Sequence, residues 1–351
     1  MWCSEYLTRN FRNLRPLRTL WDPGLNLVTG KNGSGKTNCL EGLHLVTGWG
    51  PFGERRDLPS WDGEGSRAFI SGAFCGEEDL FISMAAGGAT LIKCDGKRAS
   101  FTEVRTRVPA LAFLPGDMAL LDGAPSVRRA FMDRLCALLF PLYARGLSEY
   151  GRALRHKAAL LREGKSAAAL SKVMAPLAAS IWTSREEAVR LLSLGLANFK
   201  ELTVLPLQLS HERGGAFGDG AAEEDWFRSL EKWSGRERAA CVSLVGPHRD
   251  DLKVRAEGRP PGAVFSRGQL RRASVALMLS AAKAAEARLR RKPVILMDEI
   301  ASELDEEGRR RTIEALGGSG WQVIAAAAEL PKREWPGKMW KADDGAILPV
   351  L

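Results

Sequence analysis

The segment Gly30-Lys31-Asn32-Gly33-Ser34-Gly35-Lys36-Thr37 decides the fold of this chain. It matches the phosphate-binding pattern G-x-x-x-x-G-K-[ST] of a P-loop. The apolar alternation of residues 25–29 predicts a strand before the loop, and residues 37–45 predict a helix after it. Strand, glycine-rich loop and helix in this order are the context that the motif requires, so a chance glycine-rich turn is the weaker interpretation.

The residue types of this loop suit a nucleoside triphosphate. Glycines let backbone N–H groups close around phosphate oxygens, and the N-terminus of the following helix adds its dipole. We expect Lys36 to reach the β- and γ-phosphates of ATP and Thr37 to help hold Mg²⁺.

A second apolar run supplies the carboxylates that a P-loop needs. Residues 293–297 predict a buried parallel strand that ends at Asp298 and Glu299. Asp298 is expected to hold Mg²⁺, and Glu299 to polarise the attacking water as a general base. A buried strand followed by a solvated acidic turn is the alternative, which the P-loop makes weaker.

The composition narrows the class of protein. A chain of 351 residues with a net charge of +9 favours a polyanionic partner such as nucleic acid. The six cysteines are scattered and the four histidines have no paired spacing, which argues against a disulfide framework and a metal site built from histidines. No apolar run approaches the roughly 20 residues of a membrane span. We therefore expect a cytoplasmic protein without a membrane partner.

Residues 266–272 open a helix, rich in Ala and Leu, that we expect to continue to about residue 291. Ser266, Gly268 and Gln269 at its N-terminus could bind an anion. Because the chain already has a P-loop, this end would face the γ-phosphate held by another subunit; an ordinary capped helix is the alternative. P-loop, capped helix, Asp-Glu strand and the turn 302–305 follow the order of ABC-type ATPases, whose two sites form between two heads.

The segments between these motifs predict an inserted domain. Residues up to about 122 are β-rich, with strands at 68–74, 79–84 and 111–114 and a hairpin at 90–98. Helices are then expected from Ser126 as a cap, over 143–162 and over 167–199, within a helical stretch that reaches about 243. The fold class is α/β, an ABC-type P-loop ATPase head with a mixed sheet and an inserted helical arm. The expected boundaries are 1–122 for the first head segment, 123–244 for the arm and 245–351 for the second head segment.

The arm carries a basic surplus. Residues 128–165 contain nine basic and three acidic side chains. Such a stripe could neutralise phosphates and bind nucleic acid in a salt-sensitive manner, and a solvated basic face explains it about as well. The candidate DNA contacts are Arg128, Arg129, Arg145, Arg152 and Arg155.

The motifs together resemble one family, the RecF proteins of bacterial DNA replication and repair. Residues 30–38 with Leu40-Glu41 are similar to the family's P-loop, and residues 125–133 to its arm entrance. Residues 245–252, Val-Gly-Pro-His-Arg-Asp-Asp-Leu, are the most particular match. Residues 266–269 and 302–305 complete the set, in the expected order along the chain.

The resemblance implies an ATPase head that dimerises on ATP and binds DNA at junctions of duplex and single strand. It also implies help in loading RecA at gaps during DNA repair and recombination, with RecO and RecR as partners. By position, residues 32–38 would hold ATP, Asp298 and Glu299 would serve Mg²⁺ and hydrolysis, and Ser266, Gly268 and Gln269 would close the opposite subunit's site. Arg12 and Asn13 would lie near the base or ribose.

Two differences from the family pattern bear on hydrolysis. Leu270 replaces a polar residue of the signature helix, and residues 325–328 are alanines where the family tends to show threonines. These changes predict a weak, DNA-linked ATPase. Two alternatives stay open: an ATPase subunit of another ABC-type machine, and an ATP-binding clamp with little hydrolysis.

Overall fold

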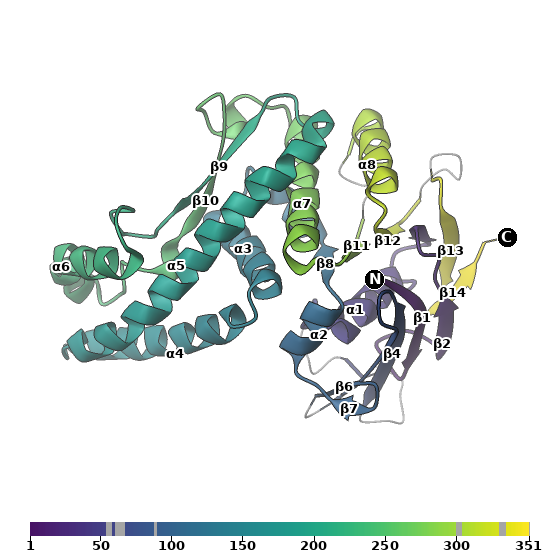
Figure 1. The fold of residues 1–351 in the computed structure, drawn as a ribbon, viewed down its shortest axis with the longest axis horizontal. Helices are drawn as coiled ribbons and strands as arrows, with labels where there is room; N and C mark the ends of the chain where they lie inside the picture. The colour runs from purple at the N-terminus through teal and green to yellow at the C-terminus, as the bar shows by residue number, and fades with distance from the viewer. Residues whose placement is uncertain (54–57, 60–66, 88–89, 300–303, 330–334, 351) are drawn as a thin grey trace. The chain divides into compact units, whose positions relative to one another are not determined.

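The chain forms two compact units in the computed structural model, which describes residues 1–53, 58–59, 67–87, 90–299, 304–329 and 335–350 (Figure 1). Unit 1 comprises Met1–Met118, Phe199–Val204 and Ser266–Leu351, and unit 2 comprises Ala119–Asn198 and Leu205–Phe265. Residues 245–265 were expected to belong to the second head segment. They lie in unit 2 because strand β10 pairs along its whole length with β9 of the same unit.

Unit 1 contains a six-stranded sheet in which the nucleotide-binding motifs come together. Its order is β14-β13-β3-β12-β11-β8, and every pair except β13–β14 is parallel. Parallel pairing places the carboxyl ends of β3 and β11 at the same edge, where ligands bind in such sheets. The strands are β14 (Ala346–Pro349), β13 (Lys338–Asp343), β3 (Leu25–Thr29), β12 (Gln322–Ala327), β11 (Val294–Met297) and β8 (Ala110–Phe113).

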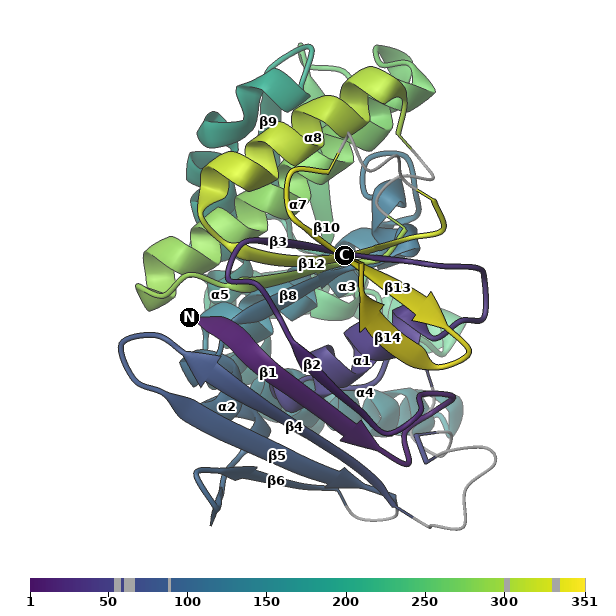
Figure 2. The same ribbon diagram turned by 90° about the vertical axis from the view of Figure 1, so that its right-hand side faces the viewer.

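A second, antiparallel sheet of unit 1 has the order β2-β1-β4-β5-β6-β7 (Figure 2). One face joins the core with side chains such as Tyr6, Ile70 and Ile82, beside Leu40 and Leu43 of α1. The predicted hairpin is confirmed: its Asp-Gly turn has φ values of 49° and 77°, which suit a type I′ turn. The strands are β2 (Leu17–Leu20), β1 (Trp2–Arg9), β4 (Ala68–Cys75), β5 (Leu80–Ala86), β6 (Leu91–Cys94) and β7 (Lys97–Arg98).

The described residues of unit 1 contain four α-helices, of which the first and the third were expected, at 37–45 and from 266 to about 291, and the other two were not. They are α1 (Lys36–Val46), α2 (Phe101–Arg107), α7 (Arg267–Leu289) and α8 (Glu306–Ser319), with 3₁₀ turns at Pro115–Ala119 and Ala197–Leu202. Helix α2 lies in the stretch that was expected to be β-rich. Its capping box, in which Ser100 and Glu103 bond each other's backbone N–H groups, was legible in the sequence. In the described parts of the chain, no helix is both long and apolar enough to cross a bilayer.

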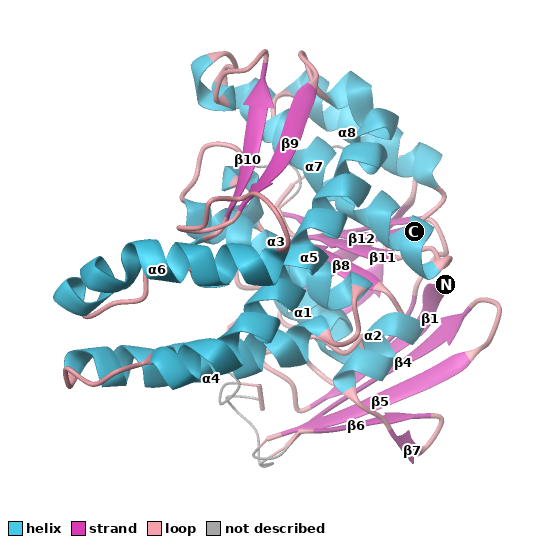
Figure 3. Ribbon diagram, turned by 60° about the vertical axis from the view of Figure 1, so that its left-hand side comes forward, coloured by secondary structure: helices cyan, strands magenta, loops and turns pink. Residues whose placement is uncertain are grey.

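Unit 2 is mainly helical (Figure 3). It contains α3 (Pro125–Leu139), α4 (Tyr143–Arg162), α5 (Ala168–Leu196), α6 (Ala222–Ala240), the antiparallel pair β9 (Leu207–Glu212) and β10 (Asp251–Ala256), and 3₁₀ turns at Pro247–Arg249 and Pro261–Ala263. The expected cap at Ser126 is wrong. Ala124 is the N-cap and Pro125 takes the first helical position, where its fixed φ is already helical. Strand β9 also lies inside the stretch that was expected to be helical.

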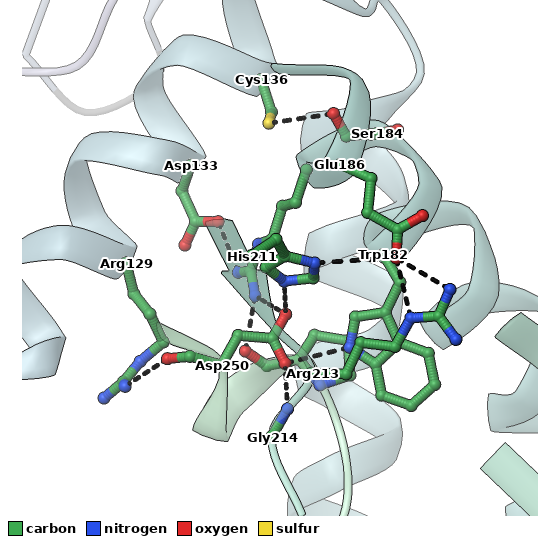
Figure 4. A network of polar contacts seen from close by, with 12 residues as sticks. Arg129, Asp133, Cys136, Trp182, Ser184, Glu186, His211, Arg213, Gly214 and Asp250 are labelled. Carbon is green, nitrogen blue, oxygen red and sulfur yellow. Dashed lines mark hydrogen bonds and ion pairs between the residues drawn. The ribbon is translucent and has the colours of Figure 1, made fainter. Parts of the chain in front are cut away.

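A buried carboxylate, Asp250, organises the interior of unit 2 (Figure 4). It accepts hydrogen bonds from Trp182 Nε1 at 3.0 Å, His211 Nε2 at 2.8 Å and the backbone N–H of Gly214 at 2.7 Å, and it pairs with Arg185. Burial by itself would raise the pKa of Asp250, but the hydrogen bond from His211 and the charge of Arg185 outweigh it and lower that pKa. A charged Asp250 therefore ties α5, β9 and the loop after β9 together.

His248 lies beside this site in a neutral form. Its Nδ1 is 2.8 Å from the Tyr150 hydroxyl and its Nε2 is 3.1 Å from the carbonyl oxygen of Ser243. Because a carbonyl can only accept, Nε2 carries the proton and Nδ1 accepts from Tyr150. Burial lowers the pKa of His248 from 6.5 to about 4.

Replacing Asp250 should destabilise unit 2 strongly. In Asp250→Ala, the buried Arg185 would lose one carboxylate partner, and breaking a buried pair from one side costs about 3–5 kcal/mol. Urea unfolding of the intact chain measures the loss. Arg145→Ala is the matched control. It breaks a surface ion pair, between Arg145 and Glu149, and loss of that pair should leave the urea midpoint nearly unchanged. Equal effects of the two variants would contradict the role of Asp250.

His248 should make stability depend on pH between about 6.5 and 4. Above pH 6.5 the residue is neutral in both folded and unfolded chains and has no effect. As pH falls through this window, the unfolded chain binds the proton first, so the free energy of unfolding decreases by up to about 3 kcal/mol. His248→Gln keeps a donor and an acceptor but does not titrate. Urea midpoints at pH 7 and 4.5 should differ less in this variant than in wild type; identical differences would refute the assignment.

Candidate nucleotide site

The P-loop of unit 1 has a conformation that its glycines permit. Gly33 and Gly35 have φ values of 81° and 103°, in the region that other residues rarely adopt. A Cβ atom at position 35 would lie 2.7 Å from Cδ2 of Leu14, so a side chain there would have to displace Leu14 as well as adopt this strained backbone conformation. Lys36 starts α1, and its Nζ donates to the carbonyl oxygens of Gly30 at 2.7 Å and Lys31 at 3.1 Å. The loop is thus closed around its own lysine.

A cavity of about 560 Å³ lies over this loop. Of the predicted site residues, six P-loop and helix residues, together with Asn13 and Glu299, line it. Gly30, Lys31 and Ser34 belong to the loop but are not among the described lining residues; neither are Arg12 and Asp298. The lining residues are Asn13, Asn32, Gly33, Gly35, Lys36, Thr37, Asn38, Glu299 and Ala328.

Thr37 and Asp298 meet beside the cavity, as the two motifs predicted. The Thr37 hydroxyl donates to Asp298 Oδ2 at 2.9 Å. The other oxygen, Oδ1, is buried and has no hydrogen-bond partner within the described part of the chain. Burial raises the pKa of Asp298, more than its bond from Thr37 and the charge of Lys36 lower it. A hydroxyl and a carboxylate oxygen with unused acceptor capacity suit a hard cation such as Mg²⁺.

Glu299, the next residue after Asp298, has an unusual backbone conformation. Its φ is 54°, and non-glycine residues in this region concentrate at functional sites. The side chain lines the same cavity as Lys36 and Thr37. Ala328, which follows β12, lines the cavity too and offers no hydroxyl.

Arg12, which the resemblance places near the base or ribose, is not among the described residues that line the cavity. It is buried, and its guanidinium forms two hydrogen bonds to the carboxylate of Glu41, at 2.8 and 2.9 Å. Glu41 also accepts from the backbone N–H of Phe52 at 2.8 Å. The Arg12–Glu41 pair therefore connects the segment between β1 and β2 to α1. The role of Glu41 is not evident from its position in the P-loop motif; the sequence signal for it is a carboxylate among the apolar residues of the helix predicted at 37–45.

Asn13, by contrast, lies at the cavity as expected. Its amide donates to the carbonyl oxygen of Gly33 at 2.8 Å, and its side-chain oxygen accepts from Asn38 at 2.7 Å. These bonds link the segment before β2 to the middle of the P-loop and to the first turn of α1.

The signature helix α7 begins with the predicted residues. Ser266 Oγ accepts from the Gln269 N–H at 3.4 Å, and Gln269 Oε1 accepts from the Ser266 N–H at 2.8 Å, which forms a capping box. Ser266 is exposed, and Gly268 and Gln269 are half-buried. None of the three is among the described residues that line the P-loop cavity. Residues 302–303 of the following turn lie outside the described residues, and Asp305 caps α8.

The candidate DNA contacts divide into two groups. Arg128 pairs with Asp251 through bonds of 2.7 and 2.9 Å, and Arg129 donates to the carbonyl oxygen of Asp250 at 2.9 Å. These two side chains hold α3 to β10 and the turn before it. Arg145, Arg152 and Arg155 are exposed on α4, and Arg145 pairs with Glu149 four residues later.

Comparison with known proteins agrees with this geometry. No family model matches the chain. DNA replication and repair protein RecF of Heliobacterium modesticaldum is 31% identical, over 92% of this chain and 91% of the relative. RecF of Myxococcus xanthus is also 31% identical, over 91% and 89%.

Solved structures show the same fold. Two structures of the recombination mediator protein RecF in the RecFOR pathway, named RecF-ATPrS and RecF-ATP, superpose with TM-scores of 0.88 and 0.85 at 24% identity. They cover 100% and 99% of this chain, and 98% and 97% of theirs. An SMC head bound to the C-terminal winged-helix domain of ScpA gives 0.57 at 15% identity, covering 100% and 98%. The predicted ABC-type ATPase head is thereby confirmed, and the chain belongs to the RecF family of DNA replication and repair proteins.

Proposed function

We propose that the chain is an ATP-gated DNA-binding protein whose heads pair around ATP. One observation carries the proposal: a single cavity gathers Lys36, Thr37 and Glu299, and beside it lies Asp298 Oδ1, which has no hydrogen-bond partner among the described residues. On ATP binding, Lys36 would exchange the carbonyls of its own loop for phosphate oxygens. The Asn13 amide would position the loop. Mg²⁺, held by Thr37 and Asp298, would neutralise phosphate charge.

The position of the signature residues supports pairing. Among the described residues, those that line the P-loop cavity do not include Ser266, Gly268 or Gln269. Ser266 is exposed at the N-terminus of α7, where its N–H groups and dipole suit an anion. In the dimer this helix would meet the γ-phosphate bound to the other chain, so ATP binding and dimerisation form one linked equilibrium.

DNA is the proposed partner of unit 2. Arg145, Arg152 and Arg155 on α4 are exposed and can neutralise phosphates. The RecF relatives are replication and repair proteins, which supports binding at junctions of duplex and single strand and a role in RecA loading with RecO and RecR. Hydrolysis by Glu299 as general base would release the pair. It would be slow, because Ala328 at the cavity offers no hydroxyl to the γ-phosphate.

ATP should convert monomers to dimers that hold DNA. Sedimentation with ATP, with ADP and without nucleotide, each with and without a gapped duplex, measures this. In Lys36→Ala, loss of a charge-assisted phosphate contact should weaken ATP binding by about ten- to a hundredfold and abolish both effects. Dimers without nucleotide, or DNA affinity that Lys36→Ala leaves unchanged in ATP, would contradict the linkage.

Glu299→Gln should separate binding from hydrolysis. The amide cannot take a proton, so single-turnover hydrolysis should fall about a hundredfold or more while ATP affinity stays near that of wild type. The ATP-bound dimer should then persist longer on DNA. An ATP lifetime equal to that of wild type would instead favour the clamp with little hydrolysis. Co-purification of wild type with membranes would favour the other ABC-type machine.

A further inference from the structure

The antiparallel sheet of unit 1 has one face packed in the core and an opposite face whose side chains are partly or fully exposed. Four large apolar residues stand on it with high exposure: Leu20 at 61%, Phe69 at 49%, Phe81 at 50% and Leu91 at 38%. They come from four different strands of one sheet. Four exposed large apolar side chains on one open sheet face make that face a candidate interaction surface.

The strand register places these residues in three parallel rows. The middle row runs across all six strands, and cross-strand neighbours in it lie about 5 Å apart. Its members, from β2 to β7, are Arg18, Leu7, Ser71, Ser83, Lys93 and Arg98. The row is thus basic at both ends and small and polar in the centre.

The two flanking rows each contribute one phenylalanine. One row pairs Arg9, Phe69, Ala85 and Leu91, and the other pairs Leu20, Glu5, Ala73 and Phe81. Phe69 on β4 and Phe81 on β5 therefore stand about 13 Å apart along the strands. The residues between and beside the two rings in these rows are small: Ser71, Ala73, Ser83 and Ala85.

The charges at this surface favour a polyanion. Arg9, Lys93 and Arg98 are exposed, and Arg18 is exposed while paired with Glu5 at 2.9 Å. Within the three rows, these four basic side chains stand against one acidic side chain, Glu5, so the rows themselves carry an excess of positive charge. The acidic residues Glu77, Glu78, Asp79 and Asp95 lie in the turns between strands, and the Asp95 carboxylate accepts from the Phe81 N–H at 2.8 Å. Exposed aromatic rings flanked by basic side chains on a sheet are how several folds bind unpaired nucleotides.

We propose that this face binds single-stranded DNA, with unpaired bases stacked on Phe69 and Phe81 and phosphates near Arg9, Lys93 and Arg98. The proposal rests on the proposed DNA-binding function but uses a surface distinct from the ATP cavity and from α4. It gives the chain a way to contact the unpaired strand of a gap. A duplex has its bases stacked inside and cannot use the rings in this way.

Substitution of the rings tests the stacking directly. Binding of an oligothymidylate to the full chain, followed by fluorescence anisotropy, should weaken at least about tenfold in Phe69→Leu/Phe81→Leu, because each stacked base contributes about 1–3 kcal/mol. Phe69→Tyr/Phe81→Tyr keeps the rings and should bind like wild type. Leu20→Ala/Leu91→Ala removes exposed apolar area from the same face without removing a ring, and should also bind like wild type.

A second measurement tests the proposed contacts between basic side chains and DNA phosphates. It also distinguishes the single-strand site from the proposed ATP-dependent binding of duplex DNA. In Lys93→Gln/Arg98→Gln, the slope of log affinity against log salt should become less steep by about 1.4. ATP-dependent binding of a blunt duplex should be unchanged in all these variants, and its loss in wild type would refute the proposed function instead. Wild-type oligothymidylate affinity in the Leu variants, or a shift in their sedimentation that points to a second copy on this face, would overturn the single-strand site.

Discussion

Parallel pairing of β3 with β12, and of β12 with β11, is the constraint on which the rest of this molecule depends. It brings Thr37 within 2.9 Å of Asp298, although 261 positions separate them along the chain. The cavity exists only because three strands end at one edge. Other contacts hold the elements at that edge in place. The Asn13 bonds position the P-loop, and the Arg12–Glu41 pair positions helix α1.

The sequence was most informative where function needs a local pattern. The P-loop, its strand and helix, and the Asp-Glu strand can be predicted because backbone conformation and residue type are tied over a few positions. The capping box at Ser266 and the Asp-Gly hairpin are of the same kind. The RecF resemblance added the order of these motifs, and so the head and the arm.

Prediction ended where a residue's role depends on a distant partner. Arg128 and Arg129 looked like members of a basic stripe, yet their acceptors at Asp251 and Asp250 lie more than 120 residues later. Arg12 was likewise expected near the base or ribose of the nucleotide. The structure shows its guanidinium buried and paired with Glu41 of α1, a contact that the sequence does not reveal. Strand β9 was missed because its alternation is short and its partner β10 follows only after α6. Charge and periodicity alone cannot tell a solvated arginine from one committed to the interior.

The position of β3 in its sheet has a consequence for how the protein is made. Both neighbours of β3 come late in the chain: β12 begins at Gln322 and β13 at Lys338. A ribosome releases the apolar residues Leu27 and Val28 long before either neighbour emerges, and contacts this far apart form slowly. The segments of the helical unit all lie between residues 119 and 265. This unit can therefore fold before β12 and β13 are available to pair with β3. The nucleotide site, which needs Glu299 and Ala328, therefore cannot be completed until every segment of the arm has been synthesised.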